Sequence, residues 1–100
     1  MTENERFIDA VSNTSKEAQA LLVRKHLDYG AANIMNSPIS PMNGLTVRLY
    51  DKIARMANLL NSGNPANFES LRDTLIDISN YGLIGVMVLD DTFAPGYKHD

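Results

Sequence analysis

The sequence has no cysteine, so it can form neither a disulfide framework nor a thiolate metal site. It also has no internal repeat and no low-complexity tract. Its longest apolar run, YGLIGVMVL at 81–89, is far too short to span a bilayer. The polar opening MTENERF does not fit a signal peptide. These absences predict a cytoplasmic protein with no membrane partner.

The chain is also short of positive charge. Its net charge of −3 argues against a protein that coats duplex nucleic acid through its overall charge. A local basic stripe can still dominate one site and attract a small anion. With 44% hydrophobic residues, the 100-residue chain fits one soluble globular domain with a modest core. A homo-oligomer, either dimer or tetramer, would complete such a core.

The spacing of apolar residues predicts an all-α domain over residues 1–100, a bundle of about four helices. The predicted helices cover 3–12, 15–29, 45–60 and 67–89, with an irregular loop at 31–44 and an irregular tail at 91–100. A strand at 83–89 is the alternative for the last apolar segment. Beyond Tyr81 this helix is apolar all round, which is typical of a central helix or an oligomer contact.

Several residues mark the expected helix ends. The polar SNTS at 12–15 separates the first two helices, and Thr14 with Glu17 fits a capping box for the second. Gly30 and Gly63 suit the left-handed position past a helix end. Asn64 or Asn67 would cap the last helix.

Four sets of apolar residues are predicted to face inward. The first helix presents Phe7, Ile8 and Val11, and the second presents Ala18, Leu21, Leu22 and Val23. The third helix presents Leu45, Leu49, Ile53, Met56 and Leu60, and the fourth presents Phe68, Leu71, Leu75 and Ile78. Gly82 and Gly85 would let another backbone approach the fourth helix closely.

Two polar stripes share helix faces. One, on the third helix, consists of Arg48, Asp51, Lys52, Arg55 and Asn58; the other, on the fourth, consists of Glu69, Asp73, Asp77 and Asn80. Both stripes are also explained as solvated faces with weak ion pairs between the helices. As a functional site, the cations suit phosphate, and the carboxylates suit a hard divalent cation such as Mg²⁺.

A further polar group surrounds the end of the second helix, in KHLDYGAANI at 25–34. His26 is either a surface or capping residue or a ligand contact, and Tyr29 is either a core aromatic or a ring that stacks on a base. Tyr81 fits a core residue better than a ligand contact. No glycine-rich phosphate loop and no HExxH motif is present.

The ordered segments KHLDYGAANI, GLTVRLYDKIARMANLL and ESLRDTLIDISNYGLIGVMVL resemble the phage-enriched family called nucleotide modification associated domain 1. The resemblance covers about residues 20–90. It implies association with nucleotides. An aromatic ring would stack on the base, an asparagine would hydrogen-bond to the base edge, and the cations would bind phosphate. The implied ligand-binding residues are Lys25, His26, Tyr29, Asn33, Arg48, Lys52, Arg55, Asn80 and Tyr81.

The helical layout is also similar to the all-α, MazG-like nucleoside triphosphate pyrophosphohydrolases, which hold Mg²⁺ with paired E-x-x-E and E-x-x-D motifs. This sequence has E-x-x-x-D on the fourth helix, and its third helix offers only one carboxylate among cations. If it is such an enzyme, the metal-binding residues would be Asp51, Glu69, Asp73 and Asp77.

Two functions follow as expectations. The first is non-catalytic binding of a small phosphorylated nucleotide, with no cofactor and no catalytic residue, in the cytoplasm of an infected bacterial host. By analogy with small phage proteins, it would be an anti-defence sponge for a cyclic dinucleotide immune signal. The alternative is a Mg²⁺-dependent nucleotide pyrophosphohydrolase that acts on the dNTP pool, and a structural partner protein without a ligand is a third possibility.

Overall fold

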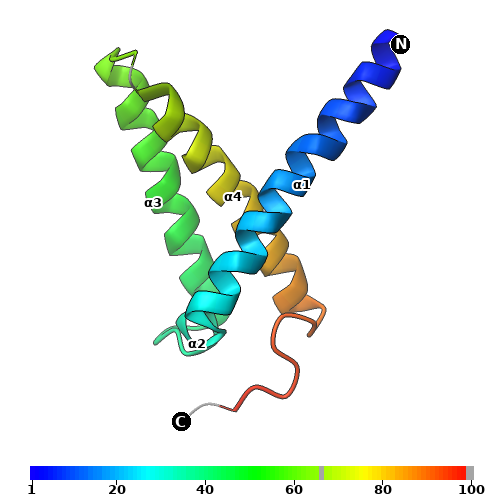
Figure 1. The fold of residues 1–100 in the computed structure, drawn as a ribbon. Coiled ribbons are helices and arrows are strands. Elements are labelled where there is room, and N and C mark those ends of the chain that lie inside the picture. Colours follow the sequence, from blue (N-terminus) through cyan, green and yellow to red (C-terminus); the bar gives the residue numbers. More distant parts are fainter. Residues whose placement is uncertain (66, 99–100) are drawn as a thin grey trace.

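All regular elements in the described part of the chain are helices (Figure 1). The computed structural model describes residues 1–65 and 67–98. Four helices follow one another in this part of the chain: α1 (Glu3–Tyr29), α2 (Ala32–Met35), α3 (Pro41–Ser62) and α4 (Asn67–Leu89). The all-α prediction is therefore confirmed. The alternative strand at 83–89 is wrong, because these residues complete α4.

Helix α1 is continuous, so the predicted break at 12–15 is wrong. Serine, threonine and asparagine cost a helix only a few tenths of a kcal/mol each, and residues 1–29 contain neither glycine nor proline to stop it. The capping box predicted at Thr14 and Glu17 lies inside the helix. The actual box is at the chain start, where Glu5 N donates to Thr2 Oγ1 at 3.1 Å and Thr2 N donates to Glu5 Oε1 at 3.4 Å.

Glycine ends α1 and α3 as predicted. Gly30 has φ of +71° and its N–H donates to the His26 carbonyl at 2.8 Å, and Gly63 is left-handed with φ of +64°. The predicted loop at 31–44 is shorter than expected, because it contains α2 and the first turn of α3. Ser40 caps α3 by accepting a hydrogen bond from Asn43 N, and Pro41 follows at the first helical position.

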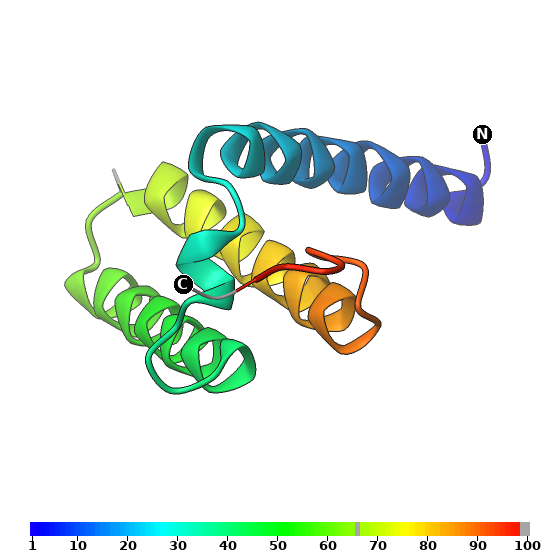
Figure 2. The same ribbon diagram turned by 90° about the horizontal axis from the view of Figure 1, so that it is seen from below.

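Helix α4 is the centre of the fold. Helix α3 packs along it, and α1 crosses it on another side (Figures 1 and 2). The main apolar cluster joins Ile34 of α2, Leu45 of α3 and Ile84 of α4. Gly85 is buried beside this cluster, and a Cβ at this position would lie 3.8 Å from both Leu45 and Met42. These neighbours of Gly85 are side-chain atoms of α3 at ordinary contact distance, so the predicted close approach of another backbone is not confirmed within this chain.

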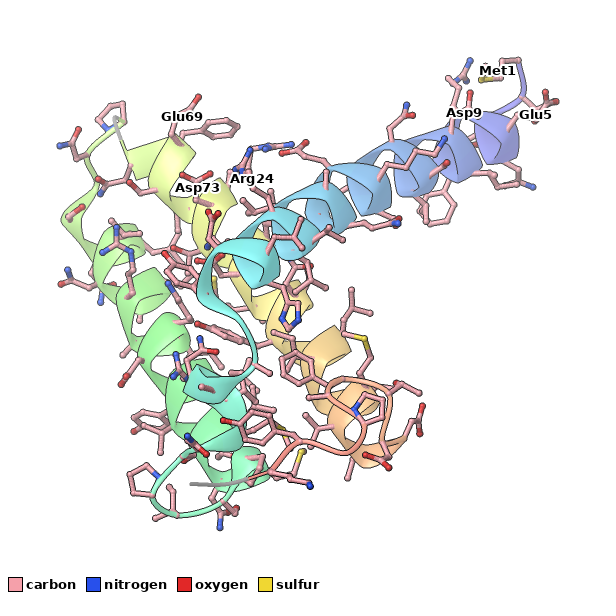
Figure 3. The ribbon with its side chains drawn as sticks, turned by 60° about the horizontal axis from the view of Figure 1, so that its bottom comes forward. Met1, Glu5, Asp9, Arg24, Glu69 and Asp73 are labelled. Atoms are coloured by element: carbon pink, nitrogen blue, oxygen red, sulfur yellow. The ribbon has the colours of Figure 1, made fainter. Side chains whose placement is uncertain are left out.

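The predicted inward faces are partly wrong. Leu45 and Ala18 are buried, but the side chains of Ile53, Leu60, Phe68, Leu75 and Val23 are each more than half exposed. For Phe68 and Leu75 the reason is the position of α4: with neighbours on two separate sides, it buries Thr74 and Ile76 instead of one straight apolar stripe. Phe7 and Ile8 are also exposed, because the first half of α1 extends beyond the other helices, as Met1, Glu5 and Asp9 show in Figure 3.

The tail after α4 is irregular over residues 91–98, as predicted, and its last two positions lie outside the described residues. Thr92 N and Phe93 N both donate to the Met87 carbonyl, at 2.8 and 3.1 Å. These bonds turn the chain back toward the bundle. No helix in the described part of the chain is long and apolar enough to cross a membrane.

Candidate functional site

A cavity of about 390 Å³ lies where the end of α1, α2, α3 and α4 meet. This volume is within the usual range for small-molecule sites. The side chains that line it divide into two kinds. The polar ones are Lys25, His26, Tyr29, Asn33, Arg48, Lys52, Asp77, Asn80 and Tyr81, and the others are Leu22, Gly30, Ile34, Ile84 and Phe93.

Eight of the nine residues predicted to bind a ligand line this cavity, although they come from four helices or turns. The exception is Arg55, which is exposed one turn further along α3. The structure thus brings the three sequence motifs together at one place. Their role in binding a ligand stays a prediction.

Helical spacing explains how each element contributes. Lys25 and Tyr29 are four residues apart on α1, as are Arg48 and Lys52 on α3, so each pair projects from one face. Gly30, with its positive φ, then turns the chain out of α1, so that Asn33 and Ile34 of α2 line the cavity. The Arg48 guanidinium holds this turn in place, because its Nη2 donates to the Asn33 carbonyl at 3.0 Å.

The two predicted polar stripes meet at Asp77. Lys25 Nζ lies 3.1 Å from Asp77 Oδ1, and Lys52 Nζ lies 3.0 Å from Asp77 Oδ2. Burial would raise the pKa of Asp77, but the hydrogen bonds from Lys52 and Lys25 and their charges outweigh it and lower this pKa. Each carboxylate oxygen is therefore committed to an ammonium group from a different helix.

This lowered pKa makes the free energy of unfolding depend on pH. The stabilisation by Asp77 is fully present above the ordinary carboxyl pKa of 3.8 and is lost as pH falls through the lower pKa of the folded state. We expect Asp77→Asn to destabilise the protein most at neutral pH, with the difference from wild type shrinking below pH 3.8. Urea denaturation at several pH values measures it.

The matched control for this prediction is Asp51→Asn, at an exposed carboxyl on α3 outside the cavity. It should change the free energy of unfolding by no more than about 0.5 kcal/mol at neutral pH. A difference between wild type and Asp77→Asn that stays constant into strong acid would contradict the role of the two lysines.

Asn80 supplies a buried hydrogen-bond acceptor. Its side chain is 6% exposed, and its Nδ2 donates to the Ala18 carbonyl at 3.0 Å. This bond fixes the orientation of the Asn80 amide, because in a flipped amide the Asn80 Oδ1 would face the Ala18 carbonyl oxygen. The Asn80 Oδ1 has no hydrogen-bond partner within the described residues. A ligand that enters the cavity with an N–H or O–H group can satisfy it.

Aromatic rings line part of the cavity. The Tyr29 side chain is 68% exposed, and the His26 and Phe93 rings meet edge to face with centroids 5.2 Å apart. Phe93 was not predicted as a site residue. Its only signal in the sequence is an aromatic residue shortly after an apolar helix, and this does not identify His26, far away in the chain, as its neighbour.

The four carboxylates of the predicted metal set do not converge. Asp77 alone lines the cavity, whereas Glu69 and Asp73 lie on the first half of α4 (Figure 3). Asp51 is exposed on α3. Within residues 1–65 and 67–98, no three side chains of the His, Cys, Asp and Glu types are close enough to hold a metal ion. The facing stripes therefore meet at one carboxylate and not along their length.

Comparison with known proteins gives one match. The sequence matches the family described as nucleotide modification associated domain 1 over residues 25–89, which is more than half of the chain. All the polar residues that line the cavity lie within this match. No curated protein and no solved structure matched the chain.

Proposed function

Because this chain belongs to the nucleotide modification associated domain 1 family, we propose that its cavity binds a small phosphorylated nucleotide without turning it over. The observation that carries this proposal is the charge of the cavity. Among the described residues, Lys25, Arg48 and Lys52 line it against a single carboxylate, that of Asp77. An excess of positive charge in one cavity of a chain with net charge −3 is a local feature that favours an anion.

Phosphate would bind on the α3 side of the cavity. The Arg48 guanidinium uses Nη2 for the Asn33 carbonyl and keeps other N–H groups for phosphate oxygens. Lys52 and Lys25 already stand at hydrogen-bond distance from one carboxylate, so both ammonium groups are held beside the same space. Charge-assisted hydrogen bonds of this kind are stronger than neutral ones.

The base would bind on the α1 and α4 side. Tyr29 offers a ring to stack on, and the apolar side chains of Ile34, Ile84 and Phe93 line the same cavity. The unpaired Asn80 Oδ1 accepts a hydrogen bond from an N–H group on the base edge. One cavity therefore combines groups for both ends of a nucleotide.

Binding fits these residues better than hydrolysis does. A Mg²⁺-dependent pyrophosphohydrolase needs several carboxylate oxygens around its metal, and the one carboxylate in the cavity is shared by two lysines. A protein that binds a nucleotide and keeps it intact can act by stoichiometric removal of that nucleotide. We include sequestration of a cyclic dinucleotide immune signal in the proposal by analogy with small phage proteins.

Calorimetric titration in EDTA and in excess Mg²⁺ tests the proposal. We expect a panel of nucleoside mono- and triphosphates and a cyclic dinucleotide to include a ligand that binds equally well under both conditions. The bound ligand should be recovered intact by mass spectrometry after the protein is denatured. Binding that vanishes in EDTA, together with pyrophosphate release when Mg²⁺ returns, would replace the proposal with the enzyme.

A further inference from the structure

One side of the central helix carries an apolar stripe that the rest of the chain leaves uncovered. Helices α1 and α3 take two sides of α4, and no other described helix lies on the third (Figure 2). We call this third side the α4 seam; it consists of Phe68, Arg72, Leu75, Ser79, Gly82, Val86 and Leu89. Its four large apolar side chains are 68%, 52%, 56% and 72% exposed in chain order.

The spacing of the seam is that of a helix that packs on another helix. Its residues alternate at intervals of four and three along the whole of α4. This is the seven-residue pattern by which two helices interlock side chains over several turns. A scattered set of exposed apolar residues needs no explanation, but four large apolar side chains aligned on one side of a helix indicate an interface.

Small residues mark the middle of the seam. A Cβ added at Gly82 would meet no atom within 4 Å, so no neighbour in its own chain requires glycine there. Gly85 is different, because it is buried against Leu45 and Met42 of α3. At Gly82 and Ser79 a second helix can approach the backbone of α4 closely, between the larger side chains of Leu75 and Val86.

We propose that the seam binds the same seam of a second copy of this chain, with the two α4 helices antiparallel and a two-fold axis between Ser79 and Gly82. In this arrangement Leu75 faces the partner's Val86. Arg72, the one charged residue of the seam, faces the end of the partner's helix, beside the partner's Asp90. Charges of opposite sign therefore meet on both sides of the axis.

The charge of Arg72 also decides the direction of pairing. Its guanidinium already binds Glu17 of α1 in its own chain, with N···O distances of 2.5 and 2.6 Å. This pair fixes the Arg72 side chain at the edge of the seam next to α1. In a parallel pair, Arg72 would face the partner's Arg72, which places like charges in an apolar contact. The antiparallel pair avoids this and sets each positive side chain near a carboxylate and the negative end of a helix.

The seam is separate from the cavity, since none of its residues lines the cavity. Association and nucleotide binding can therefore be tested apart. Light scattering of the purified protein at micromolar concentration should give twice the chain mass of 11.1 kDa. Leu75→Glu and Val86→Glu should each give the mass of one chain and keep the wild-type helical circular dichroism, because both side chains are already more than half exposed.

Leu27→Glu is the matched control, because Leu27 is 79% exposed on α1 and lies outside the seam. It should keep the wild-type mass. A wild-type mass of one chain would overturn the proposal and leave the seam to a different partner. A wild-type mass that both seam variants retain would overturn it as well, as would an equal loss of mass in Leu27→Glu.

Cross-linking tests the antiparallel direction, since the chain has no cysteine of its own. Leu75→Cys and Val86→Cys are made as separate proteins, mixed and oxidised under mild conditions. The antiparallel pair should give cross-links mainly between one protein and the other, with each variant alone remaining largely uncross-linked. Efficient cross-linking of Leu75→Cys with itself would overturn this direction.

Discussion

Replacing Leu45 with alanine is expected to lower the free energy of unfolding by about 2–5 kcal/mol. Leu45 is 2% exposed and joins α3 to Ile34 of α2 and Ile84 of α4. Removing its side chain leaves a cavity that Gly85 opposite cannot fill. Domains of this size are typically stable by about 5–15 kcal/mol, so the loss would be a large part of the total. Urea denaturation followed by circular dichroism measures it.

Val47→Ala is the matched control, two residues further along α3. Its side chain is 52% exposed, so its truncation should cost less than about 1 kcal/mol. Both substitutions shorten an apolar side chain on the same helix, and their difference isolates burial. Equal losses in the two variants would show that Leu45 does not join α2 to α4.

The helix ends that the sequence predicted well have strong local causes. Gly30 and Gly63 adopt backbone angles that glycine tolerates best, and α4 begins and ends where predicted. Helix α3 begins at Pro41, before the predicted start at residue 45. Pro41 is compatible with the first helical position, where an N–H has no partner in any case.

Burial was harder to predict, because it depends on where neighbouring helices lie. An apolar stripe shows that a helix has a preferred face but not which neighbour covers it. On α4 nearly every side is apolar toward the end, so the sequence could not distinguish the side against α3 from the open seam. Thr74 is tolerated in a buried position because its Oγ1 donates to the Ser70 carbonyl at 2.7 Å within the helix.

The sequence predicted most of the residues of the site but not which of them contact one another. Spacing of three and four placed Arg48, Lys52 and Arg55 on one face of α3. Which of them reach the cavity depends on where α1 crosses α4, and only the structure gives this. Lys52 and Lys25 converge on Asp77, whereas Arg55 lies beyond the cavity. Phe93 reaches the cavity because the irregular tail folds back, and the tail has no periodic pattern from which this could be predicted.

Arg48 and Arg55 of α3 should therefore differ in nucleotide binding, although the family resemblance implied that both bind the ligand. Arg48→Ala is expected to weaken binding by about 1.5–3 kcal/mol, the usual worth of a hydrogen bond to a charged group. Its guanidinium lines the cavity and is held in place by the Asn33 carbonyl at 3.0 Å. Calorimetric titration with the ligand identified by mass spectrometry measures the change.

Arg55→Ala removes the same charge from the same helix but from outside the cavity, so its dissociation constant should stay within about twofold of wild type. Arg48→Lys keeps the charge but loses the planar fork, and it should recover part of the affinity lost in Arg48→Ala. Thermal unfolding of Arg48→Ala shows whether the loss of the bond to Asn33 has loosened the turn after α1. If Arg48→Ala and Arg55→Ala weaken binding equally, the effect is long-range charge, and phosphate does not bind at Arg48.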